Sequence, residues 1–213
     1  MRVAIVDYKA GNLTSVQRAL NRLNIGSQIT SDPSIILKAE RIIFPGVGAA
    51  GKAMKVLKDL GIDEALREAF FNGRPILGIC LGSQIILDRS EEDSSICLGL
   101  IPGEVKRFPE DLKDSSGQRL KVPHMGWNRV LLRKRHPVFE GITEEHEFYF
   151  VHSYYPCPLE DSCIIGETDY GIVFCSVLGK DSLIAVQFHP EKSGRPGLRL
   201  LENFCKWNGK SYA

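Results

Sequence analysis

The chain has 213 residues, of which 43% are hydrophobic and 25% charged, and its formal net charge at pH 7 is only +1. A chain of this length can form a single domain, here residues 1–213, that buries roughly 70% of the surface its unfolded form exposes, so its core needs no metal, disulfide or second subunit. The near-neutral charge gives no electrostatic basis for binding nucleic acid or an anionic membrane, and it favours a small neutral substrate or a protein partner.

The first half of the chain alternates short apolar runs with helical spacings of apolar residues. The runs predict strands at Val3–Tyr8, Ser27–Thr30, Arg41–Phe44 and Pro75–Ile79, the third of them stopped by Pro45-Gly46. Helices are predicted between them, at Leu13–Leu23, from Asp32-Pro33 onward, at Ala53–Leu60 and at Ile62–Phe70. Strands that alternate with helices need right-handed crossovers, so we expect an α/β fold with a mostly parallel central sheet and helices on both faces.

The second half changes character, because the helical period disappears from about Cys97 to Val177. Short β-type runs take its place, at Arg129–Leu132, Phe148–Val151 and Ile172–Val177. They predict an antiparallel β extension of the sheet, with a polar loop tip at 111–117. A further buried strand at Leu183–Phe188 and a closing helix around Leu198–Cys205 complete the predicted elements.

The apolar run Val3–Val6 is far too short for a signal-peptide core or a membrane span, so we expect a cytoplasmic protein. The six cysteines include no C-x-x-C pair, which argues against a zinc site or a thioredoxin-type motif. We expect no metal and no cofactor, and free thiols in the reducing cytoplasm. Cys97, Cys175 and Cys205 are expected to be small buried hydrophobic residues. Cys80 differs from them.

The segment Gly78-Ile79-Cys80-Leu81-Gly82 lies where a buried strand meets a helix that we expect to begin near Gln84. In such a G-x-nucleophile-x-G elbow the nucleophile occupies a tight, strained turn. The residues two before and two after it must lack a Cβ, and here both are glycine. Unpaired N–H groups at the helix start favour the thiolate over the thiol. The motif therefore predicts Cys80 as a nucleophile rather than as an ordinary buried cysteine.

A partner for this nucleophile is predicted at His189-Pro190-Glu191, at the end of the last buried strand. In an extended chain residues two apart project to the same side, and Pro190 fixes the backbone between them, so Glu191 can hold the imidazole of His189. This is the logic of a triad in which the acid sets the histidine tautomer and the histidine moves the proton. Alone, the tripeptide is more typical of a turn. His136 and His146 are expected on the surface.

The elbow and the Phe188-His189-Pro190-Glu191 segment together resemble the class I, or triad, glutamine amidotransferases. Four further segments are similar to the HisH family, the glutaminase subunits of imidazole glycerol phosphate synthases: Val6–Leu13, Pro45–Gly48, Pro123–Asn128 and Phe150–Tyr154. The resemblance extends from residue 3 to about residue 204. It implies the three-layer class I amidotransferase fold, L-glutamine as substrate, and a HisF-type (β/α)8 cyclase subunit as partner in a heterodimer.

The resemblance also implies roles for individual residues. Cys80 would attack the side-chain amide of glutamine, and the ammonia would pass to the partner to form imidazole glycerol phosphate and a purine precursor in histidine biosynthesis. Backbone N–H groups of Val47 and Leu81 are the implied oxyanion hole. The implied substrate-binding residues are Gly46, Gly48, Gln84, Glu92, His152, Ser153 and Tyr154, with Glu92 on the α-amino group. The implied partner interface is Asn12, Pro123, His124, Met125, Trp127, Asn128 and Lys192, with 123–128 in a turn.

Three alternatives stay open at this point. A HisH-like subunit of another synthase, such as a sugar-modifying one, would deliver the same ammonia, and complementation of a histidine auxotroph would separate the two. A catalytically silent regulatory domain is disfavoured by the intact Cys80, His189 and Glu191. A stand-alone cysteine hydrolase on a similar fold would have no need for the 123–128 segment.

Overall fold

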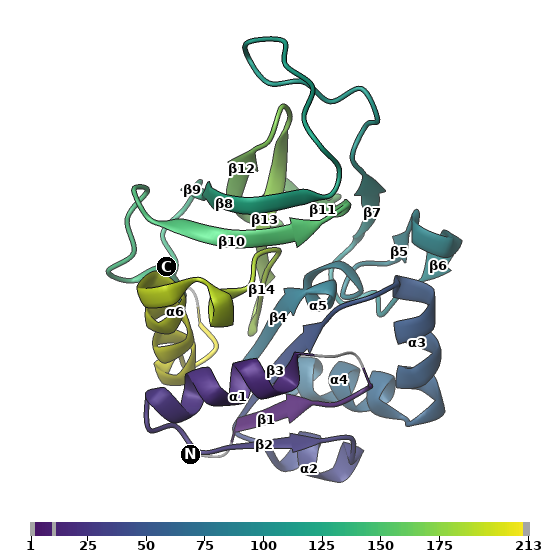
Figure 1. Ribbon diagram of the computed structural model, residues 1–213. Coiled ribbons are helices and arrows are strands. Elements are labelled where there is room, and N and C mark those ends of the chain that lie inside the picture. The colour runs from purple at the N-terminus through teal and green to yellow at the C-terminus, as the bar shows by residue number, and fades with distance from the viewer. Residues whose placement is uncertain (1–2, 10–11, 211–213) are drawn as a thin grey trace.

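The computed structural model describes residues 3–9 and 12–210, and an eight-stranded sheet runs through them (Figure 1). In spatial order its strands are β2 (Ser27–Thr30), β1 (Val3–Val6), β3 (Arg41–Gly46), β4 (Ile76–Cys80), β14 (Leu183–Val186), β13 (Val173–Lys180), β12 (Ile164–Asp169) and β9 (Leu131–Leu132). The strands from β2 to β14 are parallel, and β13, β12 and β9 add antiparallel pairs. The predicted α/β fold with an antiparallel extension is confirmed.

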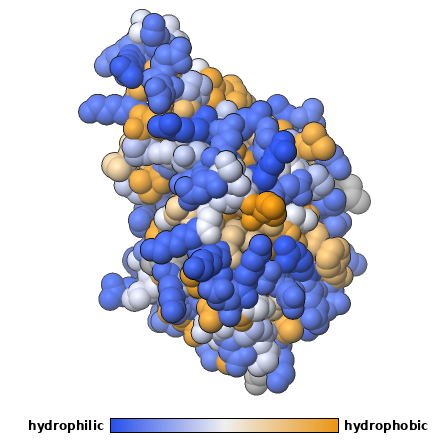
Figure 2. Space-filling model, turned by 90° about the vertical axis from the view of Figure 1, so that its right-hand side faces the viewer, coloured by the Kyte–Doolittle hydropathy of each residue, from blue (hydrophilic) through white to orange (hydrophobic). Residues whose placement is uncertain are grey.

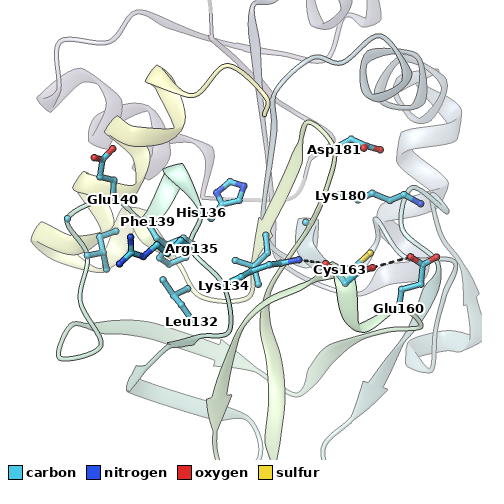
Figure 3. Close-up of a pocket in the computed structure, with 15 residues that line it drawn as sticks. Leu132, Lys134, Arg135, His136, Phe139, Glu140, Glu160, Cys163, Lys180 and Asp181 are labelled. Atoms are coloured by element: carbon cyan, nitrogen blue, oxygen red, sulfur yellow. Dashed lines mark hydrogen bonds between the residues drawn. The ribbon is translucent and has the colours of Figure 1, made fainter. Parts of the chain in front are cut away.

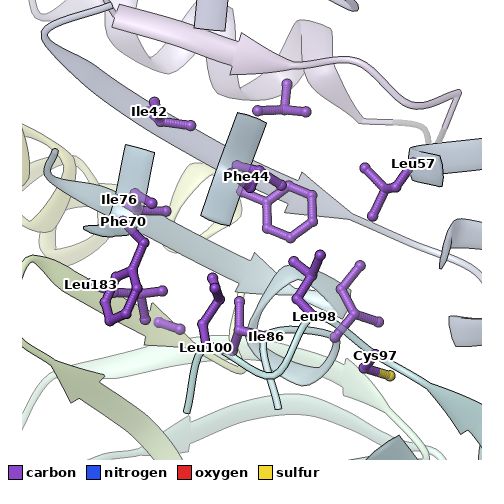
Figure 4. Packing of buried hydrophobic residues seen from close by; sticks show 14 of the residues in the cluster. Ile42, Phe44, Leu57, Phe70, Ile76, Ile86, Cys97, Leu98, Leu100 and Leu183 are labelled. Carbon is purple, nitrogen blue, oxygen red and sulfur yellow. The ribbon is translucent and has the colours of Figure 1, made fainter. Parts of the chain in front are cut away.

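Helices cover both faces of the parallel part because β1, β3, β4 and β14 are apolar on both sides. On β1, Val3 and Ile5 belong to the core formed with α1 (Leu13–Arg22) and α6 (Gly194–Lys206). The alternate residues Ala4 and Val6 belong to the core on the other face. The helices there are α2 (Pro33–Lys38), α3 (Ala50–Asp59) and α4 (Ile62–Phe71). In Figure 4 the side chains of Ile42 and Phe44 on β3 lie in this second core together with Leu57 of α3.

The helix start predicted at Asp32-Pro33 forms as expected. The Asp32 carboxylate accepts a hydrogen bond of 2.8 Å from the N–H of Ser34, and Pro33 occupies the first turn, where an N–H would have no partner. The predicted boundary at Pro45 is wrong, because β3 continues to Gly46, which pairs with Cys80. Beyond Ile43 only β4 pairs with β3, so the strand tolerates a proline.

Two smaller sheets lie beside the large one. One pairs β8 (His124–Arg129) with β10 (Glu147–His152), and in Figure 1 these two strands run side by side above α6. The other contains β11 (Tyr154–Pro158), β7 (Gly103–Arg107), β5 (Arg89–Ser90) and β6 (Ser95–Ile96). Short helices complete the fold: α5 (Leu81–Gln84), η1 (Glu92–Ser94), η2 (Pro137–Phe139), η3 (Asp161–Cys163) and η4 (Pro190–Lys192). The predicted polar loop tip lies in the segment 108–123, which projects at the top of Figure 1.

The segment around residue 129 differs from the prediction. The turn predicted at 123–128 is wrong, because these residues form most of β8, an edge strand. The single strand predicted at Arg129–Leu132 is also wrong, since β8 ends at Arg129 and Leu131 begins β9 in the eight-stranded sheet. Val130 between them is buried, so the chain passes from one sheet to another at a core residue.

His136 is buried, and the prediction that it lies on the surface is wrong. Its Nδ1 accepts a hydrogen bond of 3.2 Å from the N–H of Val138, and its ring meets Trp207 edge-on. Burial and the charge of Lys134 lower the pKa of His136 to about 4, so the ring is neutral at pH 7. This histidine caps the short helix that begins at Pro137.

Cys97, Cys175 and Cys205 are buried in the two cores, as predicted. Among residues 3–9 and 12–210 no helix is long and apolar enough to cross a membrane. The same residues contain no group of three or more His, Cys, Asp or Glu side chains that would hold a metal ion. Figure 2 shows the face over α3 and β6 as mostly hydrophilic, with apolar side chains in small groups.

Candidate active site

Cys80 lies at the end of β4 with φ 53° and ψ −108°, a conformation that is costly for any residue with a side chain. The surrounding packing imposes it. A Cβ on Gly82 would overlap the carbonyl oxygen of Phe44, and a Cβ on Gly78 would lie 2.9 Å from the Ala185 side chain. The predicted elbow is therefore present, with both of its glycines required. The helix after it begins at Leu81 and ends at Gln84 rather than beginning there, so it is a single turn.

His189 and Glu191 meet as predicted, although by a different geometry. Nδ1 of His189 lies 2.8 Å from Oε1 of Glu191, and the two side chains are 2% and 1% exposed. Pro190 and Glu191 belong to the turn η4 and not to an extended chain, so the turn rather than strand alternation brings the carboxylate to the ring. Asn12, which sequence reasoning assigned to the interface, also donates a hydrogen bond to Oε1 of Glu191. Contacts from His189 and Asn12 thus hold the Glu191 carboxylate in place.

The other ring nitrogen of His189, Nε2, is buried and has no hydrogen-bond partner among the described residues. Burial lowers the pKa of His189, but the nearby Cys80 sulfur and the Glu191 carboxylate raise it by more, to about 10. The contacts to Cys80 and Glu191 therefore favour the protonated form of the imidazole. Its Nε2–H is the free donor beside the sulfur, which is the arrangement that proton transfer to a leaving group needs.

A second contact to the sulfur comes from Gln187, a residue that sequence reasoning missed. Its Nε2 lies 3.8 Å from Sγ of Cys80, and its Oε1 accepts a hydrogen bond of 3.0 Å from Nε2 of Gln84. Gln187 precedes His189 by two residues and is fully buried. A glutamine in the otherwise apolar run 183–188, two positions before a predicted catalytic histidine, was the signal in the sequence.

A cavity of about 420 Å³ opens beside Cys80, a size suited to a small ligand. Its lining residues are Val47, Gly48, Cys80, Leu81, Gln84, Glu92, Pro123, Val151, His152, Ser153 and Tyr154. The structure therefore gathers the predicted nucleophile, both predicted oxyanion residues and six of the predicted substrate-binding residues around one space. The exception is Gly46, which pairs with Cys80 in the sheet and packs against the buried Tyr8 hydroxyl. His189 and Glu191 are not among the lining residues, in keeping with their burial.

Glu92 brings a negative charge to the cavity. Its Oε2 accepts a hydrogen bond of 2.7 Å from the N–H of Ala50 at the start of α3, which fixes the carboxylate. Burial raises the pKa of Glu92, and the Ala50 N–H acts in the opposite direction. A carboxylate held in this way suits a cationic group of a ligand, such as an α-ammonium.

The predicted interface residues on β8 divide between its two faces. Met125 and Trp127 point outward, at 62% and 54% exposure, and Trp127 meets the ring of Tyr149 edge-on. Nζ of Lys192 lies 5.7 Å from the centre of the same Tyr149 ring. His124 points inward and is buried, so its side chain cannot be part of an exposed surface.

A larger cavity, of about 990 Å³, lies away from Cys80 (Figure 3). Its cations Lys134, Arg135 and Lys180 are matched by three carboxylates, and Lys134 is engaged by the carbonyl of Ser162. None of the predicted site residues lines it. Size alone therefore does not mark the candidate active site, which is distinguished instead by the strained backbone of Cys80.

The model of the protein family described as Glutamine amidotransferase class-I matches residues 4–207 of the chain. The imidazole glycerol phosphate synthase subunit HisH of Maridesulfovibrio salexigens is 56% identical over 205 residues, which cover 96% of each chain. The subunit of the same name from Acinetobacter baylyi is 47% identical over 209 residues, or 97% of this chain and 98% of that one. A solved structure titled as a glutamine amidotransferase superposes with a TM-score of 0.73 at 18% identity, over 97% of this chain and 99% of that one. At this identity the similarity shows the fold alone.

Proposed function

Because the chain belongs to the class I glutamine amidotransferases, and within them to the HisH subunits of imidazole glycerol phosphate synthase, we propose that Cys80, His189 and Glu191 are its catalytic triad. It is the glutaminase subunit of that synthase, an enzyme of histidine biosynthesis. The observation that carries the residue assignment is the strained Cys80 beside a cavity, near a buried His189 that Glu191 holds. Residues 1–213 are proposed to form one amidotransferase domain that works in the cytoplasm.

In the proposed reaction the sulfur of Cys80 attacks the side-chain amide carbon of glutamine. The protonated His189 gives its Nε2 proton to the leaving nitrogen, so ammonia departs and a thioester remains. His189 then takes a proton from water, which attacks the thioester and releases glutamate. Glu191 keeps the imidazole in the orientation and charge state that both steps need.

The cavity supplies the remaining contacts of this proposal. Backbone N–H groups of Val47 and Leu81 are assigned to the developing oxyanion, and loss of one such donor typically costs about 10²- to 10³-fold in rate. Gly48 has φ 101°, so the backbone after Val47 takes a conformation that only glycine adopts readily. Glu92 is assigned to the α-ammonium of glutamine. The segment from His152 to Tyr154 lines the same space and is assigned to its amino-acid end.

The partner is proposed to be a HisF-type (β/α)8 cyclase, bound in a heterodimer at the mouth of this cavity. Pro123 lines the cavity and immediately precedes β8, whose exposed Met125 and Trp127 provide the apolar, aromatic centre typical of an interface. Lys192 and Asn12 are assigned to its rim, because one follows the triad acid and the other donates to it. Ammonia released at Cys80 would then emerge directly into the partner.

The test is a glutaminase assay on the purified chain alone and after addition of the HisF-type subunit with its nucleotide substrate. We expect low turnover for the chain alone and a large rise in the complex, because the ammonia acceptor lies on the partner. Full activity of the isolated chain would contradict the coupling. No hydrolysis under either condition would overturn the triad assignment.

Replacing Trp127 with alanine is expected to weaken the complex by about 2 kcal/mol, a loss of about 30-fold in Kd, because exposed aromatic anchors dominate such interfaces. The Kd would be measured by titration calorimetry with the cyclase subunit. Ile96→Ala is the matched control, since Ile96 is also exposed but lies on β6. Equal Kd values for the two variants would remove β8 from the interface.

A further inference from the structure

Two buried histidines, one lining the cavity and one behind it, have imidazole rings to which the proposed reaction gives no role. His124 lies on β8 and His152 at the end of β10, and they pair in register across the two strands. Nδ1 of His124 is 3.1 Å from Nε2 of His152. Both residues are buried, at 2% and 6% exposure. Two imidazoles in direct hydrogen-bond contact inside a core need a reason, because buried polar groups are retained only when each one is satisfied.

The partners of the two rings fix the position of every proton. Nδ1 of His152 lies 2.8 Å from the carbonyl oxygen of Tyr154, an acceptor only, so this nitrogen carries hydrogen. Nε2 of His152 then accepts from Nδ1–H of His124. Nε2 of His124 in turn accepts from Nδ2 of Asn128, at 3.4 Å. Both rings are therefore neutral and protonated at Nδ1.

The surroundings keep them neutral. The His124 ring stacks on Tyr170 at 3.9 Å between ring centres, and Phe108 and Phe174 enclose both rings. Burial lowers the pKa of His124 to about 4 and that of His152 to about 3. In such an apolar enclosure a hydrogen bond is stronger than in water, so the pair is a rigid support.

The chain of hydrogen bonds continues from the Tyr154 carbonyl into the site. This oxygen also accepts a bond of 2.8 Å from Nε2 of Gln84, whose other amide hydrogen goes to Gln187. Both donors of the Gln84 amide are thereby used, which fixes the orientation of its oxygen. Gln187 then contacts the Cys80 sulfur. A continuous series of hydrogen bonds therefore connects β8 with the sulfur of Cys80.

We propose that His124 and His152 are positioning residues for glutamine hydrolysis. Together they hold the Tyr154 carbonyl at the point where it orients the Gln84 amide at the cavity. Because the exposed Trp127 lies on the same strand as His124, a displacement of β8 reaches the glutamine site through this pair. The inference rests on the proposed function, since it concerns binding and turnover of glutamine at Cys80.

The test compares two replacements of His124 in the complete complex. His124→Phe keeps a ring for the stack on Tyr170 but removes the donor to His152. His124→Asn removes the ring but keeps an N–H near the position of Nδ1. We expect His124→Phe to raise KM for glutamine by about 10-fold, the equivalent of one hydrogen bond, with a smaller change in kcat. His124→Asn should bring KM back to within about 3-fold of the wild type.

A higher KM for His124→Asn than for His124→Phe would show that the ring acts by packing. That result would overturn the proposal. Tyr170→Phe is the control, because it retains the stacked ring and removes only the hydroxyl bonded to the Lys121 carbonyl. Its KM should equal that of the wild type. If the wild-type complex hydrolyses no glutamine, the proposed function fails instead, and the two failures remain distinguishable.

A measurement on the unmodified protein is independent of how the variants fold. Nitrogen-15 chemical shifts of the imidazoles at pH 7 should show that His124 and His152 are both neutral and both protonated at Nδ1. This tautomer is required at each ring by the acceptor that faces it. A ring protonated at Nε2 only, or a charged ring, is incompatible with the series of hydrogen bonds from His124 through His152 to the Tyr154 carbonyl. Either finding would overturn the proposal.

Discussion

Replacing Cys80 with serine is expected to lower glutamine hydrolysis by about 10⁴-fold or more, because removing the attacking group of a triad typically has an effect of this order. The serine hydroxyl is a far weaker nucleophile than the cysteine sulfur. The Cys80 sulfur is also one of the two groups that raise the pKa of His189, so the variant loses that contribution as well. Glutamate release by the complex measures the effect directly.

Two controls separate loss of the nucleophile from loss of the fold. Added ammonium ions should still support the cyclase reaction in the Cys80→Ser complex, because the ammonia acceptor lies on the partner. Cys157→Ser makes the same chemical change at a half-buried thiol on β11, away from the cavity, and should leave both activities unchanged. Glutamine hydrolysis retained by Cys80→Ser would exclude Cys80 as the nucleophile.

The elbow could be predicted from the sequence because its determinants are local. Two glycines flanking Cys80 at the end of an apolar run leave few alternatives, and the structure shows that a Cβ at Gly82 would meet the backbone of β3. The pairing of His189 with Glu191 was also local, although the 3₁₀ turn that produces it was not foreseen. Short apolar runs located β1, β3, β4 and β14 for the same reason, since both faces of these strands are buried.

What could not be predicted depends on contacts between distant segments. The residues of β8 resemble a turn in isolation, and only pairing with β10 makes them a strand. His124 and His136 are polar residues without apolar periodicity around them, so their burial follows from partners elsewhere in the chain. The contact of Asn12 with Glu191 joins residues 179 positions apart. No local pattern encodes such pairs.

Replacing Gly82 with alanine is the second change for which we expect a large effect, here on stability. The added methyl group would overlap the carbonyl oxygen of Phe44, which is fully buried in β3. Neither strand can move aside, because β3 and β4 pair through Gly46 and Cys80. Forced overlap with core backbone should cost about 4 kcal/mol or more. For a chain of this size that lowers Tm by about 8 to 16 °C, which calorimetry would measure.

Gly117→Ala is the matched control for this prediction. Gly117 has φ 84°, so alanine there is strained by the backbone, at a cost of about 1 to 2 kcal/mol, but no atom lies within 4 Å of its added Cβ. The difference between the two variants therefore isolates the overlap at the elbow from the general cost of replacing glycine. Similar Tm values would mean that β3 yields to the methyl group. The strained geometry of Cys80 would then not be imposed by packing, and the physical basis for the nucleophile would be lost.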